Sequence, residues 1–192
     1  RTLDICLDQV KYCKGFLRPH FAIMLSERYG WIPLPNKLHR SDYELIYGYI
    51  TVGSLRRLFK HWYLLDTNTD YYILQPLTKK NSKKWYASLE HQLLAEFQRV
   101  VVLPEVSTAL RLESKRYFQS ATEQEIIEGL FKNDAVALKN IHTFYRQLFV
   151  NPATLEQIGA NHEIVGDYVD MVKNQLDPTK YHKSKELITK IQ

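Results

Sequence analysis

Cysteine, glycine and proline are all scarce in this sequence of 192 residues, and each scarcity excludes a class of protein. The two cysteines, Cys6 and Cys13, are seven residues apart, which places them about 10 Å apart along a helix and too far for a disulfide. A disulfide-stapled secreted domain is therefore excluded, and two buried free thiols indicate an intracellular, reducing compartment. Seven glycines and seven prolines argue against collagen-like or long disordered segments.

Long apolar runs and several catalytic motifs are also absent. No stretch approaches the ~18 apolar residues of a membrane span, so we expect no membrane insertion. No secretory signal opens the chain, and because residue 1 is Arg we expect a processed product or an excised piece. The sequence has no Gly-rich phosphate loop, Gly-x-Ser-x-Gly elbow or His-Glu-x-x-His zinc motif. It therefore favours a protein that is not an enzyme and that carries no cofactor.

Charge and aromatic content are the informative features that remain. Hydrophobic residues make up 45% and aromatic residues 12% of the chain, with 13 tyrosines, whose rings suit half-exposed contact surfaces. The formal charge of +5 is uneven, because residues 1–100 contribute +6 and residues 101–192 contribute −1. Residues 37–84 contain nine Lys or Arg and four Asp or Glu. This asymmetry points to a polyanionic partner for the first half.

Apolar periodicity predicts a mainly α protein of the α+β type, with a helical, bundle-like body and one aromatic β-hairpin in its first half. Capping boxes are expected at Ser41/Glu44 and Thr122/Glu125, and Asp134 is expected to cap a helix. The valines before Pro104 predict a short strand. We divide the chain into a basic helix and hairpin region, 1–100, and a helical region, 101–192, with a seam near 100–121. The expected helices cover 3–17, 20–30, 42–49, 54–62, 85–100, 126–131, 135–149, 151–159, 163–176 and 184–192.

The order of elements in 42–78 is helix, turn with Gly53, helix, hairpin. The segment "SLRRLFKHWYLLDTNTDYYILQPLT" resembles the second helix and wing of the winged helix-turn-helix superfamily. One helix face carries apolar residues that would seat it on the core: Leu55, Leu58, Phe59 and Trp62. The resemblance implies that the other face contacts phosphates or base edges, with further lysines beside the wing. The candidate nucleic-acid-binding residues are Arg56, Arg57, Lys60, Lys79, Lys80, Lys83 and Lys84.

A second resemblance competes for residues 66–77. Asp66, Asn68 and Asp70 occupy positions 1, 3 and 5 of a loop that looks like an EF-hand. Tyr71 stands where the loop needs Gly, and Leu77 stands where calcium needs a bidentate Glu, so the resemblance implies a loop that does not bind calcium. The bland alternative is a hairpin turn, since Asp, Asn and Thr side chains bond their own backbone.

A third resemblance would make the protein an enzyme. "YLLDTN" is similar to the opening strand of PIN-type nucleases. That likeness implies a metal-dependent nuclease in which Asp66 holds the metal and Glu105 supplies a second carboxylate. About sixty residues precede this strand here, whereas the family opens its domain with it.

The favoured hypothesis is a non-catalytic macromolecular binding protein. Its basic region, 37–84, would contact nucleic acid or an acidic surface, and its C-terminal helices would dock a protein partner or a second copy. The alternative is a structural subunit of a larger assembly with an EF-hand-like pair that does not bind calcium, since "YGYITVGSLRRLF" also resembles the back half of such a loop. The mitochondrial matrix is the compartment suggested for that subunit. "FYRQLF" resembles the Leu-Tyr-Arg signature of small mitochondrial assembly factors, but Phe144 replaces the leading Leu, and an aromatic core stripe explains the motif better.

Overall fold

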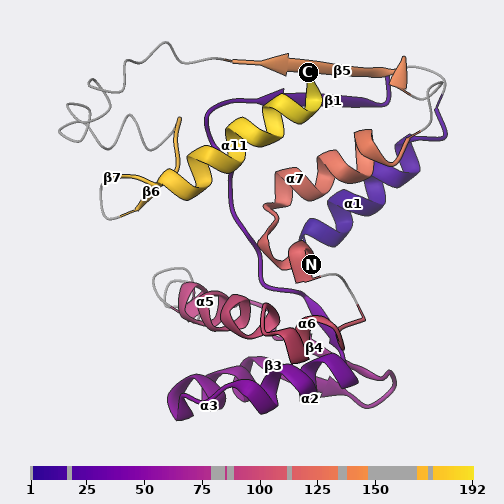
Figure 1. The fold of residues 1–192 in the computed structure, drawn as a ribbon. Coiled ribbons are helices and arrows are strands. Elements are labelled where there is room, and N and C mark those ends of the chain that lie inside the picture. Colours follow the sequence, from indigo (N-terminus) through magenta and orange to yellow (C-terminus); the bar gives the residue numbers. More distant parts are fainter. Residues whose placement is uncertain are drawn as a thin grey trace. The chain divides into compact units, whose positions relative to one another are not determined.

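The computed structural model describes residues 2–16, 19–78, 85, 89–111, 114–133, 138–146, 168–172 and 175–192. Helices accompanied by short strands make up the chain, which confirms an α+β fold (Figure 1). The chain forms two compact units. The inserted unit is residues 32–119, and the discontinuous unit joins residues 1–31 to 120–192. This division differs from the predicted one at residue 100, because the C-terminal third packs with the first 31 residues.

The inserted unit combines helices with a three-stranded sheet (Figure 1). Strands β3 and β4 pair antiparallel, and β2 pairs antiparallel with the other side of β4, so the strand order is β2-β4-β3. The elements are β2 (Lys37–His39), α2 (Arg40–Tyr49), α3 (Gly53–Trp62), β3 (Tyr63–Asp66), β4 (Tyr71–Leu74), α5 (Glu90–Val101), α6 (Pro104–Ser107) and the 3₁₀ helix η2 (Ser114–Phe118).

The core of the inserted unit lies where α2, α3 and α5 meet the sheet. Tyr43 and Ile46 from α2 and Phe59 from α3 are almost completely buried there, as are Phe97 and Val100 from α5. These residues recur every three or four positions along their helices, so each helix presents one apolar stripe to the core. The amphipathic pattern thus explains why these three helices form and which side of each is buried.

The discontinuous unit is built around a parallel strand pair. Its elements are α1 (Thr2–Cys13), β1 (Phe21–Leu25), α7 (Ala121–Ile126), the π-helix η3 (Ile127–Phe131), β5 (Ile141–Tyr145), β6 (Met171–Val172), β7 (Gln175–Leu176) and α11 (Pro178–Ile191). Strand β1 pairs with β5, from Phe21 opposite Ile141 to Leu25 opposite Tyr145. Ile23 and Leu25 are buried against Ile126 of α7 and Leu187 of α11. The alternation of β1 therefore turns one face toward the helices.

A buried carboxylate connects the two parts of the discontinuous unit. Asp170 accepts hydrogen bonds from the backbone amides of Tyr29 (2.7 Å) and Gly30 (3.0 Å). Gly30 has a φ of +97°, which favours glycine at this position. Lys180 of α11 lies 3.5 Å from the same carboxylate. One side chain therefore fixes a turn that is 140 residues away in the sequence.

Several sequence predictions about secondary structure are wrong, and non-local pairing is the main reason. Residues 21–25, expected in a helix, form β1, and residues 141–145, also expected in a helix, form β5. The predicted helix 163–176 gives way to β6 and β7 where it is described. Residues 100–101 end helix α5, and Pro104 begins α6 where a strand was expected. Residues 151–159 and Asp134 lie outside the described residues.

Both predicted capping boxes are displaced by two residues. Helix α2 begins at Arg40, and its cap is His39, whose Nδ1 accepts from the amide of Ser41 (3.2 Å). Helix α7 begins at Ala121, and its cap is Ser120, whose hydroxyl accepts from the amide of Glu123 (3.1 Å). In both cases the helix starts earlier than the sequence spacing suggests, so the predicted cap falls inside the first turn.

The two cysteines are free thiols on α1, and both are partly buried, whereas the sequence predicted full burial. In the described ranges, no helix has the length and apolar character that crossing a bilayer requires.

Gly129 of η3 leaves room for an aromatic ring. A β-carbon at this position would lie 2.3 Å from the ring of Phe21, far inside contact distance. We expect Gly129→Ala to lower the free energy of unfolding by about 1–3 kcal/mol, because the half-buried ring of Phe21 must move from its packing against the core of the discontinuous unit. Urea unfolding measures the change. Gly48→Ala is the control, since Gly48 lies in α2 with nothing within 4 Å, and it should stabilise by about 0.5–1 kcal/mol.

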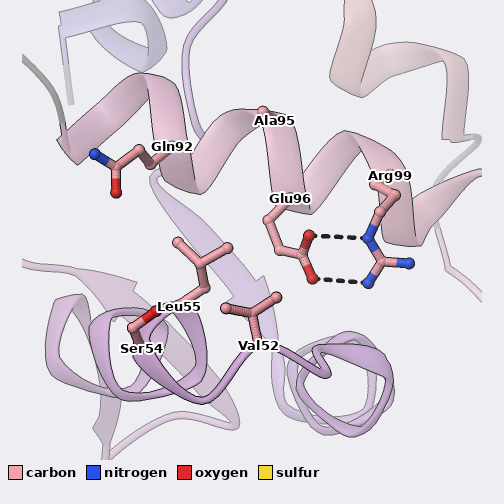
Figure 2. Close-up of a pocket in the computed structure, with 7 residues that line it drawn as sticks. All are labelled: Val52, Ser54, Leu55, Gln92, Ala95, Glu96 and Arg99. Carbon is pink, nitrogen blue, oxygen red and sulfur yellow. Dashed lines mark hydrogen bonds and ion pairs between the residues drawn. The ribbon is translucent and has the colours of Figure 1, made fainter.

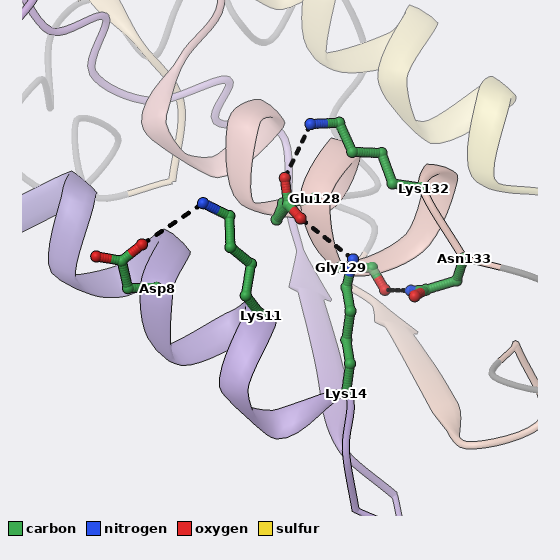
Figure 3. A network of polar contacts seen from close by, with 7 residues as sticks. All are labelled: Asp8, Lys11, Lys14, Glu128, Gly129, Lys132 and Asn133. Carbon is green, nitrogen blue, oxygen red and sulfur yellow. Dashed lines mark hydrogen bonds and ion pairs between the residues drawn. The ribbon is translucent and has the colours of Figure 1, made fainter.

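Glu128 ties α1 to the helical turn η3 (Figure 3). Its carboxylate accepts hydrogen bonds from Lys132 (2.9 Å) and from Lys14 (3.2 Å), which directly follows α1. Burial alone would raise the pKa of Glu128, but the two lysines outweigh it and hold the pKa below its ordinary value. The nearby pair of Asp8 and Lys11 is exposed, with 3.5 Å between its charged atoms.

The lowered pKa of Glu128 predicts a pH-dependent contribution to stability. The charged carboxylate stabilises the fold at all pH values above its unfolded pKa, and this contribution disappears as the pH falls through the folded pKa. Glu128→Gln should therefore lower the free energy of unfolding most at pH 7, and the difference from the parent should shrink toward pH 3. Asp8→Asn should change it little at either pH, because its pair is exposed. Equal losses for Glu128→Gln at both pH values would contradict the assignment.

Candidate functional site

Helix α3 carries the candidate site of the inserted unit. Its inward side holds Phe59 and Trp62, which are buried, with Leu55 and Leu58 packed against the same core. Its outward side exposes the three cations predicted from the sequence, which are Arg56, Arg57 and Lys60. The helix contains no Asp or Glu. The amphipathic pattern that seats the helix therefore also gathers positive charge on its exposed face.

A layer of aromatic rings packs against the buried face of α3. Tyr43 of α2 stacks on Tyr72 of β4, with ring centroids 3.6 Å apart, and on Phe59 of α3 at 5.1 Å. Tyr63, the first residue of β3, lies 4.8 Å from Phe59, and its hydroxyl donates to the carbonyl of Pro35 (2.7 Å). Burial raises the pKa of Tyr43 and of Tyr63, so both rings stay neutral at physiological pH. The layer places α3 on a packed, uncharged base.

The cations of α3 differ in how they are held. The guanidinium of Arg56 lies over the ring of Tyr47, 4.3 Å from its centroid, as expected for a cation–π contact. Within the described residues, no carboxylate lies within ion-pair distance of Arg56, Arg57 or Lys60. Arg56 is therefore oriented by an aromatic ring, and all three keep their positive charge available to a partner.

The acids of the same segment are already occupied. Glu44 pairs with Arg40 at 2.9 Å, and Asp70 lies 3.3 Å from His39. Asp42 is buried and accepts from the backbone amide of Arg111 (3.3 Å). None of these three carboxylates contacts a cation of α3.

A shallow hollow of about 450 Å³ lies beside the start of α3, and α5 forms its other wall (Figure 2). Val52 and Leu55 line it on one side, and Glu96 and Arg99 on the other. Glu96 is buried, and both of its oxygens accept from Arg99, at 2.7 and 2.8 Å. Arg99 also donates to the carbonyl of Tyr49 at the end of α2 (3.1 Å). Arg99 therefore connects α5 to the end of α2 and pairs with the buried carboxylate of Glu96.

The remaining predicted residues fall into two groups. Lys79, Lys80, Lys83 and Lys84 lie outside the described residues. Asp66 is the last residue of β3, and Asn68 and Asp70 lie in the turn to β4, where Asp66 accepts from the amide of Asn68 (3.0 Å). Glu105 is exposed in the first turn of α6. Across the described residues, no three His, Cys, Asp or Glu side chains gather as metal ligands would.

Two parts of the site were not predicted from the sequence. Strand β2 is only three residues long, "KLH", and its pairing with β4 is not local, so no sequence pattern predicts it. The stacking of Arg56 on Tyr47 joins neighbouring helices across a turn. Tyr43 and Tyr47 lie four residues apart on α2, and this spacing was the one available signal that two rings share a helix face.

The pair of Glu96 and Arg99 provides a test of this packing. Arg99→Leu leaves the buried Glu96 carboxylate without its partner, so we expect the free energy of unfolding to fall by about 1–3 kcal/mol. Arg57→Leu removes an exposed arginine from α3 and should change stability by less than about 0.5 kcal/mol. Urea unfolding of both variants measures the difference, and similar losses would contradict a structural role for Arg99.

Comparison with known proteins finds distant relatives. No family model matches the chain, and no solved structure matches it. The chain is 26% identical to NACHT and WD repeat domain-containing protein 2 of Homo sapiens and 28% identical to the protein of that name from Mus musculus. Both matches cover 89% of this chain but only 10% of each relative's own length.

Proposed function

We propose that this chain is a non-catalytic binding protein whose α3 face contacts a polyanion, with nucleic acid as the first candidate and an acidic protein surface as the second. The observation that carries the proposal is the exposed trio of Arg56, Arg57 and Lys60, which no carboxylate of the described residues neutralises. Such a face attracts phosphates by charge and by release of counterions. Lys79, Lys80, Lys83 and Lys84 would extend this face beside the hairpin.

The order of elements supports a winged-helix-like module. The hairpin β3–β4 directly follows α3, and β2 precedes α2 and joins the same sheet. In such a module α3 would be the helix presented to the partner, and the aromatic hairpin would be the wing. Winged helices also bind proteins, so the module by itself does not choose between the two partners.

The distant relatives support a second proposal, that this chain works as part of a larger assembly. Proteins named for NACHT and WD repeat domains contain a segment similar to it that makes up about a tenth of their length. In that setting the C-terminal helices would dock a protein partner. The EF-hand-like pair and the PIN-like nuclease stay predictions, and no contact in the described residues favours either.

Charge reversal on α3 tests the first proposal. Arg57→Glu with Lys60→Glu should reduce binding to a random-sequence DNA duplex at low salt at least tenfold, because two phosphate contacts become repulsive. Lys139→Glu with Lys190→Glu is the matched control, since it changes the formal charge equally on exposed residues of the discontinuous unit. Fluorescence anisotropy across a salt series measures both.

The outcomes of this titration separate the alternatives. A parent chain that binds duplex with a steep salt dependence, and loses that binding only through the α3 variant, supports nucleic acid. A parent chain that does not bind duplex or single-stranded DNA at low salt overturns the nucleic-acid proposal and leaves the acidic protein surface. Equal losses in both variants would mean that net charge matters and the α3 face does not.

A further inference from the structure

Strand β3 forms an open edge of the sheet in the inserted unit. Within the described residues it pairs with β4 on one side and with no strand on the other. Its sequence, Tyr-Leu-Leu-Asp, has no Lys or Pro. Leu64 and Leu65 remain 53% and 38% exposed. Natural edge strands are usually protected by charges, prolines or bulges, and an unprotected apolar edge is a template for pairing with another strand.

The hydrogen bonds of β4 show which backbone groups face this open edge. The amide of Leu74 donates to Asn36 on the β2 side, and the amide of Gln75 donates to Trp62 on the β3 side, both at 2.8 Å. The backbone N–H and C=O groups of successive residues therefore point to opposite sides of a strand. Those of Leu64 point to β4, and those of Tyr63 and Leu65 point outward, to the open edge. The amide of Tyr63 is used by the carbonyl of Phe59. The groups left at the edge are the carbonyl of Tyr63 and both groups of Leu65.

Charges at the two ends of β3 indicate what occupies the edge. Lys60 and His61 are exposed just before the strand, and Asp66 ends it. Asp66 uses Oδ1 to hold the turn at Asn68. An antiparallel neighbour that is basic before its strand and acidic at its end would be complementary at both ends. A second copy of β3 has these properties.

We infer that two copies of this chain pair antiparallel through β3 about a twofold axis, with Leu64 opposite Leu64. In this register Tyr63 of one copy meets Leu65 of the other, so residues that meet differ by an even number and point to the same face of their strands. The core-facing sides of the two sheets therefore lie on the same side of the joined sheet. The amide of each Leu65 meets the carbonyl of the other Tyr63, which satisfies the exposed donor. The two Leu64 side chains meet in the non-hydrogen-bonded pair, where neighbouring strands approach most closely. In this register each Asp66 lies opposite Trp62 of the other copy, which directly follows His61.

The short strand implies a weak, reversible dimer. Two ladder hydrogen bonds and four leucine side chains form a contact smaller than that of stable complexes. Self-association is thus expected to depend on protein concentration. The pairing shares Lys60 and the hairpin with the proposed polyanion face, but its contacts are backbone and apolar groups of β3, so it forms without nucleic acid.

Sedimentation velocity of the nuclease-treated full chain, from micromolar to millimolar concentration, tests the pairing. The weight-average mass should rise toward twice the monomer mass at the highest concentration. Leu64→Lys should abolish the rise, because two like charges would face each other across the axis. Val102→Lys is the control, since Val102 is 55% exposed at the end of α5 and belongs to no strand of the sheet, and it should leave the rise unchanged.

Mixing two variants tests the register itself. Leu64→Lys and Leu64→Glu should each stay monomeric alone and should associate when mixed, because opposite charges then meet at the axis. A parent chain that is monomeric at every concentration overturns the proposal, as does a Leu64→Lys chain that still dimerises or a Val102→Lys chain that does not. A mixture that stays monomeric overturns the twofold register.

Discussion

The stacking of Tyr43 between Phe59 and Tyr72 is the contact on which the inserted unit depends. It joins α2, α3 and β4 at one point, with centroid distances of 5.1 and 3.6 Å. Phe97 of α5 extends the same aromatic packing from the other side of Phe59. Aromatic rings provide large buried area with few rotatable bonds, so they fix the direction of α3 better than flexible side chains would. The exposed face of α3 has a defined orientation because its buried face has one.

The electrostatics of the inserted unit follow from that orientation. Phe59 and Trp62 turn inward, so the opposite side of the helix turns outward, and Arg56, Arg57 and Lys60 are exposed there. Glu44 pairs with Arg40 on α2, and Asp70 of the β3–β4 turn lies 3.3 Å from His39 of β2. The positive face of α3 thus arises because these nearby acids contact residues outside α3, as well as from an excess of bases. A count of charges along the sequence measures only the excess, and so it gives the sign of this region but not its position.

Local patterns predicted helices of the inserted unit but not the strand pair of the discontinuous one. The apolar stripes of 54–62 and 85–100 identified α3 and α5, because each helix is stabilised by packing of one face that its own sequence displays. "FAIML" and "IHTFY" have no such guide, since short apolar runs fit a helix or a strand equally well. Their strand conformation depends on each other across 120 residues. The site followed the same rule: its helix was predictable, whereas the pairing of β2 and the stacking of Arg56 on Tyr47 were not.

The connectivity of the chain explains why local patterns predicted helices of the inserted unit but not the strand pair of the discontinuous unit. The discontinuous unit is closed by contacts between distant segments, such as Asp170 with the amides of Tyr29 and Gly30. The inserted unit is one continuous stretch, and its core residues all lie within it. Of the exposed cations of α3, Arg56 stacks on Tyr47, whereas substitution of exposed side chains such as Arg57 and Lys60 costs a fold little. The fold of the inserted unit therefore does not require that Arg57 and Lys60 be cations.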